Sequence, residues 1–222
     1  MTMAWMPMCG QSWVSAAASF VGMWSAMMAA MMLPSLGPML WRYRRAVGQT
    51  GETRPALLTA LVGGGYFLVW ILLGVAVFPL GAAAVAATLR HPALARAVPA
   101  AIASTVLASG ALQLSRWKAR HLARCRESGC HGTSARGHAL PGNVLTAWLH
   151  GLRLGLHCAQ CCAGLTAVLL VTGIKDLPAM LAVTAAVTVE RLAPAGERVA
   201  RAIGVVVVGG GLLLSFRAAG IG

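Results

Sequence analysis

The amino-acid sequence predicts an all-α protein, a polytopic bundle of about six transmembrane helices. Of its 222 residues, 58% are hydrophobic and only 10% are charged, and the mean hydropathy is +0.74. An ordinary soluble domain carries roughly 25% charged residues, so a soluble enzyme, a disordered tail and a small disulfide-rich secreted protein are all poor interpretations. The hydrophobic runs are continuous and do not alternate with polar residues, which favours helices over a barrel.

Six hydrophobic segments account for the predicted helices. They lie at about residues 15–40, 57–82, 97–114, 145–172, 177–190 and 199–216. A span needs about 20 residues to cross about 30 Å of hydrocarbon, so the fifth segment is short and is expected to be tilted, re-entrant or a half-span. We treat residues 1–222 as a single transmembrane domain. No basic residue precedes the first hydrophobic run, so we expect no cleaved signal peptide.

The basic residues predict the orientation of the helices. The chain has 18 Lys and Arg against 5 Asp and Glu. If all six segments cross the membrane, thirteen basic residues fall on one side and four on the other, with Arg153 inside the fourth segment. The thirteen are Arg42, Arg44, Arg45, Arg54, Arg116, Lys118, Arg120, Arg124, Arg126, Arg136, Arg191, Arg198 and Arg201. Basic loops stay in the cytoplasm, so we predict a bacterial inner membrane protein with cytoplasmic basic loops.

The loops also exclude one class of partner. Nucleic-acid binding favours aromatic platforms among the basic residues, and the most basic loop, residues 115–143, offers only Trp117. We therefore predict that the protein interacts with the lipid bilayer and does not bind nucleic acid.

Residues 115–143 form the largest predicted basic cytoplasmic loop. Its first part, residues 115–127, is predicted to be a short amphipathic helix on the inner membrane face; the alternative is an ordinary basic loop that touches anionic lipid. His121 and Cys125 are four residues apart in this segment, and Cys130 and His131 follow. They form either a cytoplasmic metal relay or a set of scattered surface side chains.

The strongest candidate for chemistry is a cysteine triplet in the fourth segment. Cys158, Cys161 and Cys162 are three and four residues apart, a spacing that brings side chains to one face of a helix. Thiolates suit soft metal ions. His157 points about 100° away and is a ligand only at the edge of such a site. The alternative is that cysteine here is a small apolar packing residue.

The first segment carries a stripe of methionines at helical spacing. Met27, Met28, Met31 and Met32 form i,i+4 pairs, and thioether sulfur is a soft, neutral ligand. The alternative is that these flexible side chains fill gaps between helices. Met27 lies 14 residues from Trp41 and Cys158 lies 14 residues from Val144, about 21 Å along each helix. The two clusters are therefore predicted at a similar depth.

Other catalytic chemistry is absent from the sequence. The chain has only five acids and no paired carboxylates, P-loop, nucleophile elbow or zincin helix. We therefore do not predict an enzyme. Glu190 and Arg191 end the fifth segment and form either a local ion pair or an outer partner of the metal site.

Several pieces of the sequence resemble a bacterial family of predicted metal-binding integral membrane proteins. They run from Met23-Trp24 to Met31-Met32-Leu33-Pro34-Ser35, and include Gly65-Tyr66 with Trp70, Gln113 to Lys118 with Cys125-Arg126, Gly151 to Cys162, Gly173, and Glu190-Arg191. The family commonly has Cys where His121 stands, which keeps a metal-capable side chain. Some members are associated with copper delivery to tyrosinase-type oxidases. The resemblance therefore implies metal binding and copper handling.

These observations give one leading hypothesis and two alternatives. The leading hypothesis is a membrane protein that binds copper(I) and passes it to a cuproenzyme or a copper carrier. The first alternative is a membrane thiol-disulfide oxidoreductase that uses Cys158 and Cys161, because CxxC spacing is typical of such enzymes. The second is a structural membrane subunit without metal.

Overall fold

The computed structural model describes residues 5, 10–49, 54–122, 143–173, 176–193 and 195–219, and within these ranges the chain forms helices and no strand. The helices are α1 (Trp13–Gln49), α2 (Pro55–Arg90), α3 (Pro92–Leu114), α5 (Val144–Thr172), α6 (Leu177–Leu192) and α7 (Gly196–Ala218). Residues 116–122 are also helical. The predicted all-α bundle is confirmed, and each predicted segment lies within one helix.

Five of these helices are long and apolar enough to cross a membrane: α1, α2, α3, α5 and α7. With 36 and 37 residues, α2 and α1 are each about 55 Å long, well beyond the thickness of the hydrocarbon layer. α6 has 16 residues and is not among the five, in agreement with the short fifth segment expected from the sequence.

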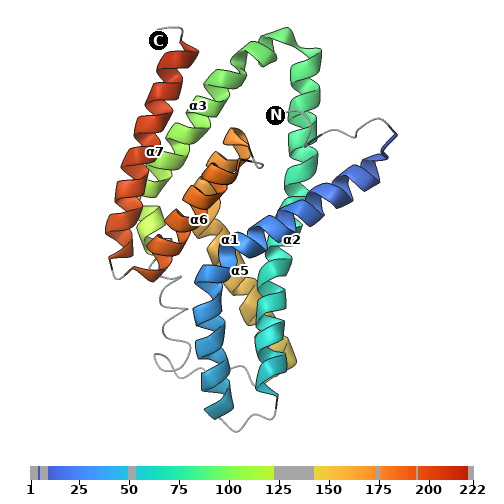
Figure 1. Ribbon diagram of the computed structural model, residues 1–222, viewed down its shortest axis with the longest axis vertical. Helices are drawn as coiled ribbons and strands as arrows, with labels where there is room; N and C mark the ends of the chain where they lie inside the picture. The colour runs from blue at the N-terminus through green and yellow to red at the C-terminus, as the bar shows by residue number, and fades with distance from the viewer. Residues whose placement is uncertain are drawn as a thin grey trace.

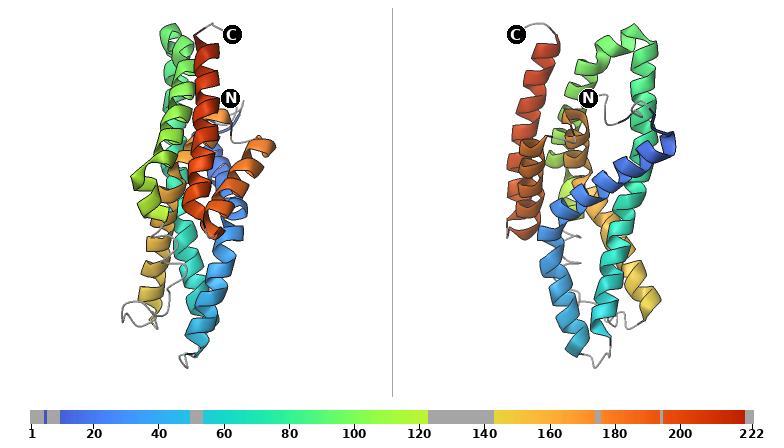
Figure 2. Two further views of the ribbon diagram at one scale, coloured as in Figure 1. Left: turned by 90° about the vertical axis from the view of Figure 1, so that its left-hand side faces the viewer. Right: turned by 45° about the vertical axis from the view of Figure 1, so that its right-hand side comes forward.

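Consecutive helices reverse direction along the chain (Figure 1). The end of α1 and the beginnings of α2 and α5 lie at one end of the molecule, and the α2–α3 connection and the end of α7 lie at the other. At the first end, α1, α2 and α5 extend beyond the ends of α3, α6 and α7 (Figure 2). α1 changes direction along its length (Figure 1) and contains Pro34 and Pro38, residues that kink helices because each lacks a backbone donor.

The helix ends follow local sequence signals. Pro55 and Pro92 occupy the first turns of α2 and α3, where the missing backbone N–H costs nothing. The side chain of Asn143 accepts a hydrogen bond from Leu145 N at the start of α5, and Asp176 caps α6 in the same way. Gly173, with φ +131°, ends α5.

The parallel pair α2 and α5 is held in backbone contact by glycine. An added Cβ at Gly65 would lie 2.7 Å from Trp148 O, and one at Gly155 would lie 2.8 Å from Tyr66 O. Small residues permit this close approach. The contact fixes α5, which carries the cysteine triplet, against α2.

Candidate metal centre

Two helices bring three sulfur atoms together inside the bundle. Cys158 and Cys162 of α5 lie with their Sγ atoms 4.0 Å apart, and Cys158 Sγ lies 3.8 Å from Met32 Sδ of α1. The side chains are 0%, 2% and 0% exposed. The methionine stripe and the cysteine triplet therefore meet, and the contact is made by Met32.

The spacing of these sulfurs suits a metal ion between them. A metal bonded to two sulfurs at about 2.3 Å, with an angle near 120°, holds the sulfurs about 4.0 Å apart. The distances of 3.8 and 4.0 Å around Cys158 agree with that geometry. Among the described residues, no group of three or more His, Cys, Asp or Glu side chains is arranged to hold a metal; the third sulfur beside the two thiols is the thioether of Met32. Thiolate and thioether donors favour Cu(I) over hard cations.

Cys161 has a different environment from the other two cysteines. Its thiol interacts with Cys162, and its backbone carbonyl accepts a hydrogen bond from Lys118 Nζ at 2.6 Å. All three cysteines are free thiols. Cys161 therefore lies between the sulfur cluster and the neighbouring polar network.

The remaining methionines of the predicted stripe are buried on the same helix. Met27, Met28 and Met31 are 6%, 0% and 2% exposed and belong to the same hydrophobic core as Cys158. Met28 is one helical turn from Met32, about 6 Å along the axis. The stripe therefore leads through the core to the sulfur cluster.

The two predicted histidine ligands have other contacts. His157 is half-buried, and its Nδ1 atom lies 2.6 Å from the carbonyl oxygen of Arg153 on its own helix. His121 is half-buried against Trp117, with ring centroids 4.2 Å apart. Cys125 lies outside the described residues.

A buried tyrosine contacts the sulfur cluster from α2. The hydroxyl group of Tyr66 donates a hydrogen bond to Cys158 Sγ at 2.9 Å, and its side chain is 1% exposed. Cys158 is thus contacted by an oxygen from α2 and by sulfurs from α1 and α5.

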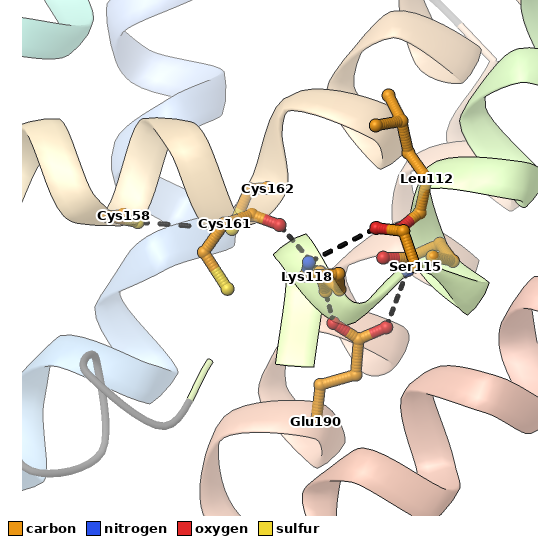
Figure 3. A network of polar contacts seen from close by, with 8 residues as sticks. Leu112, Ser115, Lys118, Cys158, Cys161, Cys162 and Glu190 are labelled. Carbon is orange, nitrogen blue, oxygen red and sulfur yellow. Dashed lines mark hydrogen bonds and ion pairs between the residues drawn. The ribbon is translucent and has the colours of Figure 1, made fainter. Parts of the chain in front are cut away.

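A buried ion pair lies on the other side of Cys161 (Figure 3). Lys118 Nζ is 2.8 Å from Glu190 Oε2, and Gln113 Nε2 donates to Glu190 Oε1 at 2.7 Å. The Lys118 and Glu190 side chains are only 3% and 2% exposed. Burial opposes the charge on Lys118, but the acidic groups of Cys161 and Glu190 outweigh it and raise the pKa of Lys118. The pair connects the stretch 116–122 to α5 and α6.

The sequence signals for these outer residues were weak. Glu190 pairs with Lys118, and Arg191 donates to Ser35 Oγ at 3.1 Å, so the partner of Glu190 is not its sequence neighbour. Ser35 Oγ in turn donates to Met32 O. Neither Lys118 nor Tyr66 was predicted as a site residue, although both lie in the pieces of sequence that resemble the metal-binding family. A further signal was the carboxylate of Glu190 at the end of an apolar segment, which demands a partner.

Long apolar helices around a buried cluster of thiol and thioether sulfurs define an all-helical protein with donors suited to a soft metal. A family model described as PpoB2, copper chaperone, matches residues 21–214. The chain belongs to this copper chaperone family, which confirms the resemblance identified from the sequence. No curated protein and no solved structure matches the chain.

Proposed function

We propose that the protein binds one Cu(I) ion between Cys158, Cys162 and Met32 in a bacterial inner membrane. The observation that carries this proposal is the contact of Cys158 Sγ with Cys162 Sγ and Met32 Sδ at 4.0 and 3.8 Å in a fully buried position. Copper is the cargo here. Binding releases the two thiol protons as the sulfurs become thiolates, and the oxidation state of the ion does not change.

Transfer follows from the labile coordination of such sites. We propose that Met27, Met28 and Met31 supply thioether contacts along α1 and that Cys161 supplies a further thiol on α5. An ion held by two or three soft ligands can move by exchanging one sulfur for the next. The receiver would be a cuproenzyme or a soluble copper carrier, in line with a family of copper chaperones.

Metal analysis of the detergent-purified chain tests the site. The six cysteines divide into two groups of three, which gives a matched pair of variants. Wild type, loaded with Cu(I) without oxygen, is expected to retain about one ion per chain. Replacing Cys158, Cys161 and Cys162 by Ser should abolish retention, because both thiolate ligands are lost. Replacing Cys9, Cys125 and Cys130 by Ser should leave that ion in place.

The other outcomes would contradict the proposed site or favour one of the two alternative functions. Equal copper content in the two triple variants would contradict the assignment of the copper site to Cys158, Cys161 and Cys162. A Cys158–Cys161 disulfide that cycles during turnover, detected by rapid alkylation and mass spectrometry, would favour the oxidoreductase. A wild type without metal, together with an unchanged fold in both triple variants, would favour a structural subunit.

The thioether ligand is tested by Met32→Leu. Leucine keeps most of the volume, so the stability cost is expected to stay below about 1.5 kcal/mol. The Cu(I) affinity should fall by about tenfold or more, because a loss of only 1.4 kcal/mol in binding produces a tenfold change. The measurement is competition with a chromogenic Cu(I) chelator. Met39→Leu, a change of a half-buried methionine on the same helix, serves as the control and should bind copper like wild type.

A further inference from the structure

Tyr66 places an oxygen atom, its hydroxyl group, directly against the sulfur cluster. Its hydroxyl group lies 2.9 Å from Cys158 Sγ, and the side chain is almost completely buried. A buried hydroxyl group needs a hydrogen-bond partner. Here the partner is a sulfur atom that also contacts Met32.

The position of the hydroxyl group is fixed by the backbone of two helices. Gly155 of α5 packs directly on the carbonyl group of Tyr66, and Gly151 packs on Val62 one turn earlier. Neither contact leaves space for a side chain. These contacts fix the backbone of Tyr66 against α5, and the side chain, which is 1% exposed, is packed in the same core as Cys158.

The sulfur of Cys158 has three close neighbours. It accepts a hydrogen bond from Tyr66, donates its own proton toward Met32, and lies 4.0 Å from Cys162 Sγ, where either thiol can be the donor. When that proton leaves, the lone pair it occupied points to the space between Cys158 and Met32. The hydrogen bond from Tyr66 is retained, since a thiolate accepts more strongly than a thiol.

We propose, building on the proposed copper site, that Tyr66 is a positioning residue for Cu(I): its hydroxyl group orients the Cys158 thiolate toward Met32 and Cys162 and slows release of the ion. The phenol keeps its proton throughout and makes no bond to the metal. Groups that hydrogen-bond a metal ligand orient it and tune its basicity, and removing one typically costs 10–100-fold in metal affinity.

Tyr66→Phe is the direct test, because it removes one oxygen atom and keeps the ring. The chain has two tyrosines, and Tyr43→Phe is the matched control: Tyr43 is also buried, at 8% exposed, but it stacks on His150. We expect Tyr66→Phe to lower the Cu(I) affinity by about 10–100-fold and to shift the near-ultraviolet thiolate-to-copper band. Tyr43→Phe should change neither. Chelator competition and absorbance spectra of the purified full chain supply both readouts.

A second measurement leaves the hydrogen bond intact. When fluorotyrosine replaces tyrosine throughout, the chain gives two ¹⁹F signals, which the two Phe variants assign. Addition of Cu(I) is expected to shift the Tyr66 signal and leave the Tyr43 signal in place. The shift should be absent when Cys158 is replaced by Ser.

The outcomes separate this inference from the copper site itself. If wild type retains copper but Tyr66→Phe matches it in affinity and spectrum, the positioning role is wrong and the site stands. A Tyr66 fluorine signal that does not shift in copper-loaded wild type would also contradict the positioning role of Tyr66. If wild type retains no copper, the proposed copper-binding function is wrong, and the role of Tyr66 is wrong with it. If Tyr66→Phe does not fold, the fluorine measurement decides.

Discussion

Lys118→Met is expected to lower the free energy of unfolding by about 3–5 kcal/mol, because it leaves the buried carboxylate of Glu190 without its cation. The ammonium group that is lost lies 2.8 Å from Glu190 Oε2 and also donates to Cys161 O. Methionine is unbranched and close in length to lysine, so the packing of the stem is largely kept. Denaturant-induced unfolding of the detergent-solubilised chain measures the loss.

A double-mutant cycle identifies the cause of that loss. Glu190→Met alone should also destabilise, because it leaves Lys118 charged and buried. The double variant should recover most of the stability, since replacing a buried ion pair by apolar groups of similar volume is often neutral. Arg120→Met is the control: Arg120 is exposed on the same helical stretch, and surface changes usually stay within about 0.5 kcal/mol. If the two single effects simply add in the double variant, the ion pair is not what stabilises this junction.

The helices were predictable because hydropathy reports burial in lipid directly. Their ends were less predictable. The first hydrophobic segment was placed at about residues 15–40, and α1 extends beyond it to Gln49 through Arg42, Arg44 and Arg45. Hydropathy marks where a helix can contact lipid, and a helix in contact with water at its end keeps its own backbone hydrogen bonds. The basic residues therefore lie beyond the apolar segment but within the same helix.

Two of the three sulfurs in the cluster could also be placed together from the sequence alone. Cys158 and Cys162 are four residues apart, so a helix alone brings their sulfurs together. The methionine partner was a stripe of candidates, and the depth comparison used Met27, whereas the contact is made by Met32. That choice depends on the crossing and the bend of α1, which follow from tertiary packing. Tyr66 is separated from Cys158 by 92 residues, and no local pattern connects the two.

Gly151→Ala is expected to separate α2 from α5 and to weaken copper binding at the same time. A Cβ at this position would overlap the backbone of Val62, including its carbonyl oxygen. Backbone atoms cannot rotate away, so the helices have to move. Overpacking typically costs about 1–3 kcal/mol, although alanine by itself favours a helix by about 1 kcal/mol over glycine. The hydroxyl group of Tyr66 would move with α2, so the Cu(I) affinity should fall by about 10–100-fold.

Gly164→Ala provides the matched control in the same helix. Its added Cβ would meet Ser109 O at 3.4 Å, an ordinary van der Waals contact, so this variant should be at least as stable as wild type and should bind copper normally. Thermal unfolding and chelator competition, measured on both variants, supply the comparison. Equal stability and equal affinity of the two would mean that the α2–α5 contact does not position the site. A loss of stability with unchanged affinity would mean that Tyr66 is not needed to hold the ion. Only the joint loss ties the glycine contact, the tyrosine and the sulfur cluster together as one structural unit.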